Sequence, residues 1–324
     1  MIASNNILKV QGLKKHFPVQ RGFFQNVVGW IKAVDGVDFE IGKGKTLGLV
    51  GESGCGKSTI GRLILRLLDP TEGGIAYKGQ DITSLSQKEI KPLRKEMQIV
   101  FQDPFGSLNP RMTIGQSIEE GLRTLGIKGR SARIARVEEL LEMVGIAPMA
   151  ADRYPHEFSG GQRQRIGIAR ALSVEPSLII CDEPVSALDV SIQAQIINLL
   201  KRLQTRLELS YLFIAHDLNV VGYISDWVAV MYLGHIMEYA PSEELFDKPL
   251  HPYTLALFSA IPEPDPQARK TIKALPGDVP SPFNPPPGCK FQGRCPLVED
   301  RCRKQEIQFY DVREGHRVRC WKVV

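Results

Sequence analysis

The sequence predicts an α/β fold in which a mainly parallel sheet carries helices on both faces. Short apolar stretches alternate with stretches of helical periodicity along most of the chain, which is typical of strand–helix–strand units. One apolar stretch, residues 46–50, leads directly into a glycine-rich loop that opens a helical pattern at residue 60. Residues 114–144 are helical in pattern throughout, which predicts a helical subdomain inserted into the core that contains the sheet.

The expected elements follow from apolar periodicity and from the glycines and prolines that interrupt it. Strands are predicted at residues 7–10, 33–41, 46–50, 73–77, 97–101, 178–181, 211–215 and 227–233. Helices are predicted from residue 60 onward and at residues 114–144, 162–172, 191–207 and 219–225. The apolar residues 23–31 are too few to span a membrane, so we interpret them as a loop insertion packed on the body.

The composition of the 324 residues is typical of a soluble globular protein, with 43% apolar and 24% charged residues. The 41 Lys and Arg residues against 36 Asp and Glu residues leave a net charge of only +5. No basic block accompanies this small excess, which argues against nucleic acid as a partner. No apolar run has the length of a membrane span, and the N-terminal residues lack a signal-peptide pattern, so we expect a cytoplasmic location.

Residues 51–59, GESGCGKST, match the phosphate-loop pattern G-x-x-x-x-G-K-[ST] between a predicted strand and a predicted helix. The loop consists of Gly51, Glu52, Ser53, Gly54, Cys55, Gly56, Lys57, Ser58 and Thr59. Its glycines let backbone N–H groups turn toward a phosphate, and the helix N-terminus adds its dipole. Lys57 is expected to reach the β- and γ-phosphates, and the Ser58 hydroxyl to ligate Mg²⁺. The pattern predicts binding of a nucleoside triphosphate; a glycine-rich turn without a ligand is the alternative.

Two adjacent carboxylates, Asp182 and Glu183, follow the predicted strand 178–181. Asp182 suits coordination of Mg²⁺ in the manner of a Walker B acid. Glu183 is expected to act as a general base or to position the attacking water. Because an adjacent base favours hydrolysis over transfer to a second substrate, the pair predicts a triphosphatase and not a kinase. The alternative is a strand that ends in an acidic turn.

A second anion-binding device precedes the predicted helix 162–172. It consists of Ser159, Gly160, Gly161 and Gln162. A Ser-Gly-Gly sequence before a helix exposes backbone N–H groups at the helix N-terminus. Two phosphate-binding devices in one chain are explained if two such chains share the nucleotide, each supplying what the other lacks.

These motifs together resemble the nucleotide-binding subunits of ATP-binding cassette (ABC) transporters. Residues 158–162, FSGGQ, are similar to the signature sequence of that family, with Phe where Leu is usual. The resemblance implies that Gln102 is the Q-loop glutamine, which contacts Mg²⁺ and the lytic water and faces the transmembrane partner. It implies that His216 is the switch histidine that contacts the γ-phosphate, and that residues 186–189 form the D-loop.

The same resemblance implies a RecA-like P-loop NTPase core with a β-rich N-terminal part, in which the Phe17 ring stacks on the adenine of ATP. Residues 1–260 are then expected to form the nucleotide-binding domain, with the helical subdomain at about 103–175. Residues 261–324 are expected to form a C-terminal extension, which we predict to be irregular because it is rich in proline.

The resemblance narrows to the peptide-importer branch of the family and to its F-type ATPase subunit. Residues 251–254, HPYT, and 275–289, LPGDVPSPFNPPPGC, match the C-terminal extension of that branch. This implies a peripheral ATPase that powers di- and oligopeptide import at the cytoplasmic face of the membrane. The implied partners are a related D-type ATPase subunit, two transmembrane permease subunits and an extracytoplasmic solute-binding protein. Each ATP would lie between Lys57 of one ATPase subunit and Ser159 of the other.

Other functions stay open at this point. The branch also includes importers of nickel, glutathione and related small solutes, and a nucleotide-binding subunit does not contact the cargo. A soluble cassette ATPase of DNA repair or translation would be expected to carry a coiled-coil insertion or tandem cassettes. An exporter ATPase would often be fused to membrane spans. The sequence contains none of these features.

Four of the six cysteines are crowded into the C-terminal extension: Cys289, Cys295, Cys302 and Cys320. Four thiolates can close a tetrahedral zinc site or hold a 4Fe–4S cluster. Tight C-x2-C pairs are absent, and Arg294, Arg301 and Arg319 lie beside the cysteines, where they would offset an anionic cluster. Since importers of this branch carry a 4Fe–4S cluster at a similar cysteine set, we predict an iron–sulfur cluster with a structural role. Zinc and unligated thiols are the alternatives.

Overall fold

The computed structural model describes residues 6–23, 25–103, 106–260 and 275–323. These residues form two compact units. Unit 1 comprises Met1–Ile41, Thr46–Ser84 and Ala215–Val324, and unit 2 comprises Gly42–Lys45 and Leu85–Ile214. The predicted boundary at residues 260 and 261 falls beside residues 261–274, which lie outside the described residues, so the domain limits stay a prediction.

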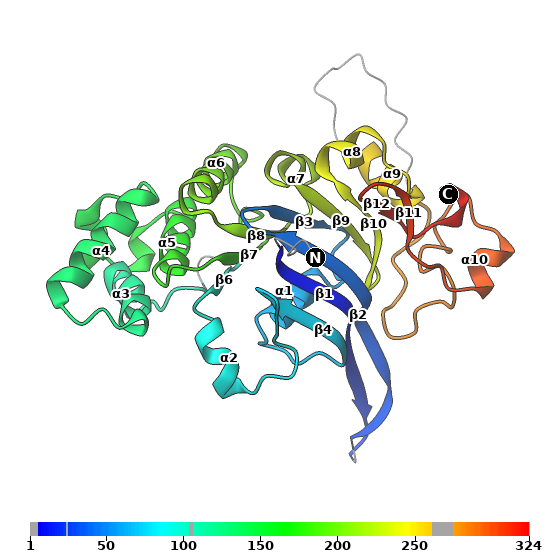
Figure 1. Cartoon of the computed structure of the whole chain (residues 1–324), viewed down its shortest axis with the longest axis horizontal. Coiled ribbons are helices and arrows are strands. Elements are labelled where there is room, and N and C mark those ends of the chain that lie inside the picture. The colour runs from blue at the N-terminus through cyan, green and yellow to red at the C-terminus, as the bar shows by residue number, and fades with distance from the viewer. Residues whose placement is uncertain (1–5, 24, 104–105, 261–274, 324) are drawn as a thin grey trace. The chain divides into compact units, whose positions relative to one another are not determined.

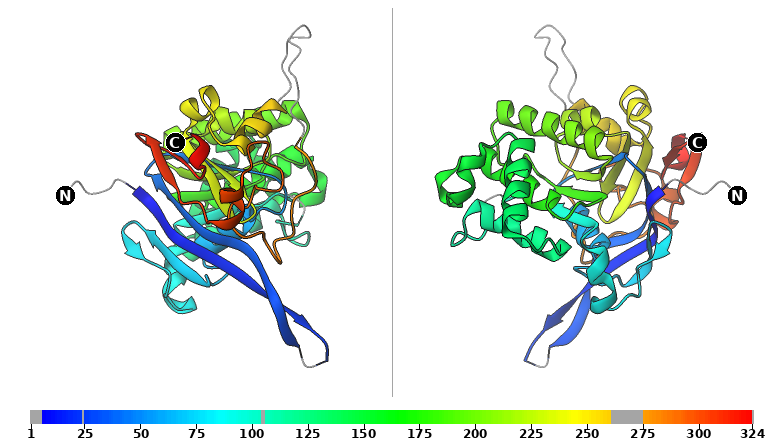
Figure 2. Two further views of the ribbon diagram at one scale, coloured as in Figure 1. Left: turned by 90° about the vertical axis from the view of Figure 1, so that its right-hand side faces the viewer. Right: turned by 60° about the vertical axis from the view of Figure 1, so that its left-hand side comes forward.

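The N-terminal part of unit 1 is a four-stranded sheet in the order β2-β1-β4-β5. Its strands are β1 (Asn6–Arg21), β2 (Asn26–Gly42), β4 (Glu72–Tyr77) and β5 (Gln80–Asp81). Figure 2 shows β1 and β2 as a long twisted ribbon of two strands in blue. The predicted strands at 7–10 and 33–41 are thus the inner ends of much longer strands.

The prediction of a packed loop insertion at residues 23–31 is wrong. Residues 26–31 belong to strand β2, and the side chains of Val27, Val28 and Trp30 are about half exposed at 50%, 52% and 48%. Phe23 is 97% exposed. Apolar composition alone does not distinguish a buried loop from an exposed hairpin, because burial depends on what the tertiary structure places beside the chain.

The second sheet of unit 1 contains the strands β11-β12-β10-β9-β3 in this order (Figure 1). Their bounds are β3 Thr46–Val50, β9 Trp227–Tyr232, β10 His235–Pro241, β11 Tyr310–Arg313 and β12 His316–Val318. The pair β3–β9 is parallel, with Leu47 opposite Trp227. The pairs β9–β10, β10–β12 and β11–β12 are antiparallel. Every residue of β3 is buried, as expected for a strand inside a covered sheet.

The helices of unit 1 are α1 (Lys57–Ile64), α7 (Leu218–Ile224), α8 (Ser242–Asp247), α9 (Pro252–Ser259) and α10 (Asp300–Lys304), with a 3-10 turn, η3, at Trp321–Val323. The sequence predicted α1 and α7 but did not predict α8, α9 or the tail helix α10. The C-terminal extension is also more ordered than predicted. Its strand β12 pairs with β10 of the main sheet, with Val318 opposite Glu238, and Phe291 and Val318 are fully buried.

Unit 2 contains three parallel strands in the order β8-β7-β6. These are β6 (Met97–Val100), β7 (Leu178–Asp182) and β8 (Ser210–Ile214). Its helices are α2 (Gln87–Leu93), α3 (Ile114–Leu125), α4 (Arg130–Met143), α5 (Gly160–Leu172) and α6 (Val190–Leu207), with 3-10 turns η1 (Pro148–Asp152) and η2 (Pro155–Glu157). Every residue of β7 and β8 is buried and both strands are nearly continuous in apolar residues, which is the pattern of parallel strands covered on both faces.

Side-chain caps determine where several helices of unit 2 begin. Ser86, Thr113 and Ser159 each form a capping box with the residue three positions later, at the starts of α2, α3 and α5. Each box satisfies two backbone N–H groups that the first helical turn leaves without partners. The predicted helical stretch 114–144 is therefore two helices, because Gly126 ends α3 in a left-handed conformation with φ of 89°.

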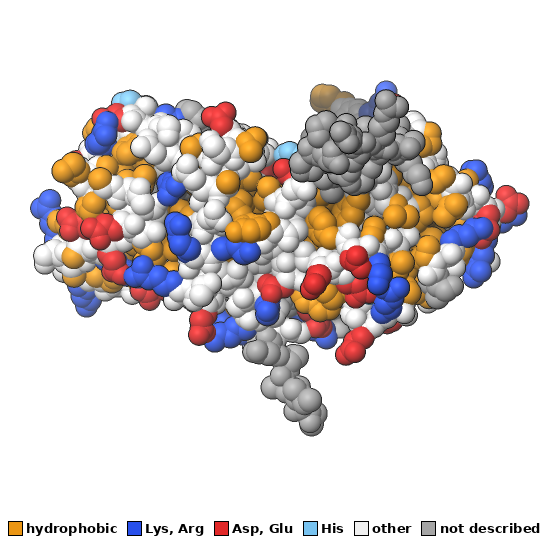
Figure 3. Space-filling model, turned by 90° about the horizontal axis from the view of Figure 1, so that it is seen from above, with side chains coloured by type: hydrophobic (Ala, Val, Ile, Leu, Met, Phe, Trp, Pro, Cys, Tyr) orange, Lys and Arg blue, Asp and Glu red, His pale blue; other side chains and the backbone are white. Residues whose placement is uncertain are grey.

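Among the residues that the structure describes, no helix is both long enough and apolar enough to cross a membrane. On the face shown in Figure 3, Lys and Arg side chains lie among Asp and Glu side chains and are not gathered into one basic area.

Candidate nucleotide-binding site

The phosphate loop follows the buried strand β3 in unit 1, and two of its glycines are required by close packing. Gly51 has φ of 150°, and a Cβ atom there would lie 2.1 Å from the carbonyl oxygen of Met231. Gly56 has φ of 110°, and a Cβ atom there would lie 2.1 Å from the carbonyl oxygen of Ala33. Any larger residue at either position would have to displace backbone. The loop thus packs closely against β2 and β9.

Helix α1 begins at Lys57 with Gly56 as its N-cap residue. Because glycine has no side chain, the backbone N–H groups of the first turn receive no side-chain cap. The Lys57 side chain is buried, at 5% exposure, and its Nζ donates to the carbonyl oxygens of Gly51 at 2.7 Å and Glu52 at 3.1 Å. A buried lysine at the N-terminus of a helix, where the backbone N–H groups have no partners within the helix, is suited to bind phosphate.

The thiol of Cys55 lies inside the loop and is buried, at 2% exposure. Burial raises the pKa of this thiol, although the nearby ammonium of Lys57, 3.8 Å from its Sγ, acts in the opposite direction. A protonated, buried thiol is a poor nucleophile. Burial and the raised pKa thus make Cys55 a poorer nucleophile than an exposed thiol.

Contacts from outside the loop fix Glu52, and the sequence analysis did not predict them. The backbone N–H of Glu52 donates to Tyr253 Oη at 3.0 Å. Its carboxylate accepts from Arg294 Nη1 at 2.7 Å. Tyr253 belongs to the HPYT motif and Arg294 adjoins a tail cysteine, so both were noted in the sequence, but neither signal pointed to the phosphate loop.

Two other predicted site residues lie in unit 1. Phe17 is in strand β1, partly exposed, with the Lys15 ammonium 5.1 Å from its ring centroid. His216 is exposed and directly precedes Asp217, whose carboxylate caps α7 by accepting from the Asn219 N–H at 2.9 Å. The backbone at both residues is ordered, and the ring of Phe17 is partly accessible to solvent and that of His216 is exposed.

In unit 2 the structure brings together two residues that were predicted to act on the lytic water. Gln102, just after β6, donates from Nε2 to Glu183 Oε2 at 3.1 Å. Glu183 directly follows Asp182, the last residue of β7, which is buried at 7% exposure. The parallel pairing of β6 with β7, with Val100 opposite Cys181, brings these strand ends to the same edge.

Glu183 has an unusual backbone conformation, with φ of 49°. Its N–H donates to the carbonyl oxygen of Ile214 at 3.0 Å, and its own carbonyl oxygen accepts from the N–H and Oγ of Ser186. A left-handed conformation of a residue other than glycine costs about 1 kcal/mol or more, and such strain is often found at functional sites. The backbone contacts hold the carboxylate in place after the strand.

Ser159 is the N-cap residue of α5. Its Oγ accepts from the Gln162 N–H at 3.3 Å, and its own N–H donates to Gln162 Oε1 at 3.0 Å. A Cβ atom on Gly161 would lie 2.5 Å from the side chain of Ile192, so α5 and α6 pack closely here. The predicted signature residues thus form one ordered helical turn.

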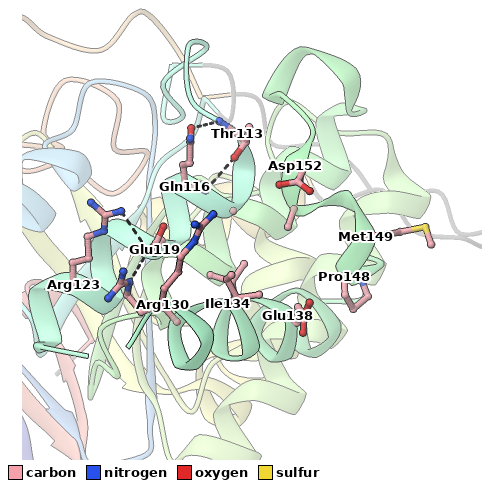
Figure 4. A pocket seen from close by; sticks show the side chains of 14 residues that line it. Thr113, Gln116, Glu119, Arg123, Arg130, Ile134, Glu138, Pro148, Met149 and Asp152 are labelled. Carbon is pink, nitrogen blue, oxygen red and sulfur yellow. Dashed lines mark hydrogen bonds and ion pairs between the residues drawn. The ribbon is translucent and has the colours of Figure 1, made fainter. Parts of the chain in front are cut away.

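The helical part of unit 2 contains a groove of about 570 Å³ between α3, α4 and η1. Figure 4 shows its lining side chains, with Glu119 joined by dashed contacts to arginines that include Arg123. Met149 at 87% and Ile134 at 47% are exposed apolar side chains on its wall. Together with the charged side chains of Glu119 and Arg123, they give the groove surface groups that a partner could contact.

The four tail cysteines lie near one another but are not arranged as a metal site. The N–H of Cys289 donates to the carbonyl oxygen of Cys302 at 2.8 Å. Burial, together with the smaller effect of the charges of the other three sulfurs, raises the pKa of Cys289 to about 12. No group of three or more His, Cys, Asp or Glu side chains within the described ranges is placed to hold a metal ion. The predicted 4Fe–4S cluster therefore has no support from this arrangement.

The arginines beside these cysteines contact other groups. Arg294 pairs with Glu52, and Arg319 donates to the carbonyl oxygens of Ile236 and Ile307. The Arg301 guanidinium lies 4.1 Å from the ring centroid of Trp321. The expectation that they offset the charge of a cluster does not match these contacts.

A phosphate loop between a buried strand and a helix, and a carboxylate–amide pair after a buried parallel strand, define the class of P-loop nucleoside triphosphatases. Residues 34–186 match the ABC transporter family, and residues 237–302 match the oligopeptide/dipeptide transporter C-terminal region. The chain is 55% identical over 327 residues to the oligopeptide transport ATP-binding protein AppF of Bacillus subtilis (strain 168), covering 99% of both chains.

Two solved structures are similar to the chain. One is cbiO1 from Clostridium perfringens, part of the ABC transporter complex cbiONQ, with 29% identity and a TM-score of 0.65 over 75% of this chain and 92% of that one. The other is the ATP-binding cassette MJ0796, a dimer in a post-hydrolysis state bound to ADP and Pi. It has 28% identity and a TM-score of 0.65, over 72% of this chain and 98% of that one.

The chain belongs to the ABC transporter family. It is therefore an ATP-hydrolysing enzyme, and the fold class, the family and the enzyme class predicted from the sequence are confirmed. The roles of the individual site residues stay predictions.

Proposed function

We propose that this chain is the ATP-hydrolysing subunit that energises an importer of oligopeptides and dipeptides. The observation that carries the proposal is the 55% identity to an oligopeptide transport ATP-binding protein over 99% of both chains. The match of residues 237–302 to the C-terminal region of oligopeptide/dipeptide transporters supports the same substrate class. No feature of the chain favours nickel, glutathione or a function outside transport.

ATP binding is assigned to the phosphate loop and to Phe17. The N–H groups of residues 54–59 surround the phosphates, and Lys57 exchanges its contacts with the carbonyl oxygens of Gly51 and Glu52 for phosphate oxygens. The Phe17 ring stacks on adenine. The buried position of Lys57 and its two short contacts in the protein support this role, because the ammonium is already held at the loop.

Magnesium is assigned to oxygen donors, which this ion prefers. The donors are the hydroxyl of Ser58, the carboxylate of Asp182 and the amide oxygen of Gln102. The chemistry of this set fits Mg²⁺, since all three offer oxygen and one carries a charge. When bound, the ion would neutralise charge on the β- and γ-phosphates.

Hydrolysis is assigned to Glu183, with Gln102 and His216. Glu183 positions the attacking water and accepts its proton, while Gln102 holds the carboxylate through the 3.1 Å hydrogen bond. His216 donates a hydrogen bond to the γ-phosphate. Each role follows from the match to the family motifs and from the accessible side chains of Gln102 and His216.

The signature residues Ser159, Gly160, Gly161 and Gln162 are assigned to the ATP of a second ATPase subunit. The start of α5 offers N–H groups and the Ser159 hydroxyl to the γ-phosphate of that ATP. The similar cassette MJ0796 forms a dimer in its post-hydrolysis state, which supports a paired arrangement. We propose that the partner is a related D-type ATPase subunit, and that closure of the pair follows ATP binding.

The groove of α3, α4 and η1 is assigned to a short segment of a transmembrane permease subunit. Such a segment would bury Met149 and Ile134, which are exposed in the chain alone. The complex would place this chain as a peripheral subunit on the cytoplasmic face of the membrane. An extracytoplasmic solute-binding protein would deliver the peptide to the permeases.

The 4Fe–4S cluster is kept as a proposal for the tail. It rests on the four cysteines of the C-terminal extension, and their thiols would have to lose their protons to hold the cluster. The test of the cluster is iron and sulfide analysis of anaerobically purified protein, together with the absorbance of the protein near 400 nm. About four iron atoms per chain would support the cluster, and zinc or no metal would overturn it.

The proposed function is tested with the whole complex. The chain is expressed with its two permeases, its partner ATPase and the binding protein, and the complex is placed in proteoliposomes. ATP-dependent uptake of a labelled oligopeptide, which unlabelled peptide suppresses and nickel or glutathione does not, is the expected result. Uptake of nickel or glutathione alone, or recovery of the chain with ribosomes or DNA, would overturn it.

A further inference from the structure

The C-terminal extension contacts the phosphate loop through one short ion pair. Arg294 Nη1 lies 2.7 Å from Glu52 Oε2, although the two residues are 242 positions apart. The Arg294 side chain is 9% exposed and that of Glu52 27% exposed. A charge-assisted hydrogen bond that is largely shielded from water is stronger than a surface ion pair.

Packing and backbone contacts determine the position of Arg294. It lies in the turn between Cys289 and Cys295, where its N–H donates to the carbonyl oxygen of Phe291 at 3.0 Å. Phe291 is fully buried, with its ring centroid 5.3 Å from those of Tyr232 and Tyr253. The guanidinium also donates from Nε to the carbonyl oxygen of Pro276 at 3.3 Å. These contacts hold the guanidinium against the loop.

The backbone of Glu52 also contacts the phosphate-binding lysine and a residue outside the loop. Its N–H donates to Tyr253 Oη, and its carbonyl oxygen accepts from Lys57 Nζ. Arg294 therefore holds the side chain of the same residue whose backbone contacts the phosphate-binding lysine. A change in the position of Glu52 would reach Lys57 directly.

The charge of Glu52 is unfavourable in a loop that binds a triphosphate. A carboxylate without a partner would repel the phosphates, and it would compete with them for the ammonium of Lys57. Arg294 supplies the opposite charge from the extension. We propose that Arg294 is a positioning residue for ATP binding: it neutralises Glu52 and holds it away from Lys57, so that the extension determines the affinity of the phosphate loop for ATP.

This inference rests on the ATP site proposed above, and it is tested by equilibrium binding of MgAMP-PNP, a non-hydrolysable ATP analogue, to the full chain. Arg294→Ala is expected to raise the Kd by about tenfold, which corresponds to the lower end of the range for one lost charged hydrogen bond. Arg294→Lys is expected to recover part of the affinity, since it restores the charge but not the planar geometry. The deficit of Arg294→Ala is expected to shrink at high salt, because it is electrostatic.

The decisive variant is the pair Glu52→Gln with Arg294→Ala. If Arg294 acts by neutralising Glu52, removing the carboxylate also removes the need for the arginine, and the double variant binds MgAMP-PNP about as tightly as Glu52→Gln alone. A general loss of folding in the tail would not be rescued in this way. The matched control is Arg319→Ala, which removes another tail arginine whose guanidinium contacts the carbonyl oxygens of Ile236 and Ile307 and not the loop.

The outcomes separate this inference from the proposed ATP site. Binding by the wild-type chain and its loss in Lys57→Ala establish that the loop is the site, whatever Arg294 does. Unchanged affinity in Arg294→Ala, an equal loss in Arg319→Ala, or an undiminished deficit in the double variant would each overturn the role of Arg294. Thermal unfolding of each variant without nucleotide is measured alongside, and a shift of Arg294→Ala beyond that of Arg319→Ala counts against a role confined to the loop.

Discussion

At the scale of single residues, Glu183 combines the features expected of a residue that acts on water. It follows a buried strand, its backbone is held in a left-handed conformation, and its carboxylate accepts a hydrogen bond from Gln102. The Glu183 backbone makes three hydrogen bonds that maintain this conformation: its N–H donates to the carbonyl oxygen of Ile214, and its carbonyl oxygen accepts from the N–H and Oγ of Ser186. The chain thus retains a strained backbone at the position where the proposed chemistry needs a fixed carboxylate.

Glu183→Gln is expected to reduce ATP hydrolysis by the assembled complex at least about 100-fold while leaving the Kd for MgATP within about twofold. The amide is nearly isosteric and its oxygen can still accept from Gln102, but it cannot accept a proton from water at neutral pH. Phosphate release and equilibrium ATP binding are the two measurements.

Glu175→Gln is a matched control, because Glu175 is another glutamate of unit 2 with a left-handed backbone, with φ of 55°, and its carboxylate contacts Arg136. It is expected to hydrolyse ATP normally. Near-normal turnover by Glu183→Gln would remove Glu183 from the mechanism.

At the scale of the helix, the start of α5 can be compared with the start of α2, since both have a serine capping box of nearly the same geometry. Ser159 Oγ accepts from a backbone N–H at 3.3 Å, and Ser86 Oγ does so at 3.4 Å. Ser159→Ala and Ser86→Ala are each expected to lower the free energy of unfolding by about 1 kcal/mol.

Only Ser159→Ala is also expected to reduce ATP hydrolysis by the complex, by about tenfold or more, because only Ser159 would contact the partner's γ-phosphate. Urea unfolding of the isolated chain and turnover of the complex are measured for both variants. Equal activities would show that Ser159 acts as a helix cap alone.

Helix α9 depends on a neutral histidine. The N–H of Tyr253 donates to Nδ1 of His251 at 3.0 Å, and His251 is 1% exposed. Burial lowers the pKa of His251 to about 4, opposed by the carboxylate of Glu238 and assisted by the guanidinium of Arg319. The unfolded chain would bind the proton near pH 6.5.

Since the pKa of His251 is depressed in the folded state, its contribution to stability is present above pH 6.5 and is lost as the pH falls toward 4. The loss is about 3 kcal/mol in the free energy of unfolding. His251→Asn can cap the helix without titrating, so its stability is expected to fall less over this range.

Urea unfolding of both proteins between pH 7 and pH 4.5 measures this difference. His316 acts with the opposite sign, because the carboxylates of Glu238 and Glu244 raise its pKa against the effect of burial. It is present in both proteins and cancels in the comparison. Parallel stability curves for the two proteins would contradict the role of His251.

At the scale of the whole chain, local patterns predicted the elements that follow one another closely in sequence. Strand β3 has the bounds that the apolar stretch 46–50 predicted. The observed and predicted bounds differ by one or two residues for α5, β7, α6 and β8. Gln102 and Glu183 are brought together as the motifs implied. The prediction of the phosphate loop needed no tertiary information, since its glycines, its lysine and the strand and helix beside it are contiguous in sequence.

Features that depend on distant pairing were not predictable in this way. Strand β12 has three residues, and it pairs with the distant strand β10 as well as with its sequence neighbour β11. The exposed hairpin of β1 and β2 was predicted as a packed loop, because the apolar composition of a segment does not determine what packs around it. The contact of Arg294 with Glu52 joins residues that are 242 positions apart, and no local pattern indicates which acid a tail arginine contacts.

The groove of α3, α4 and η1 leads to a prediction for the assembled transporter. Ile134→Glu and Met149→Glu each place a charge on an exposed apolar side chain of its wall, which a permease segment would otherwise bury. Burying one such side chain contributes about 1.5–3 kcal/mol, so we expect recovery with the permeases to fall about tenfold or more.

Leu207→Glu is the matched control, since Leu207 is an exposed apolar residue of unit 2 at the end of α6, outside the groove. All three variants are expected to bind MgAMP-PNP as the wild-type chain does, because none lies in the phosphate loop. Normal assembly of both groove variants would exclude this face as the docking surface, and an equal loss in Leu207→Glu would attribute the effect to surface charge in general.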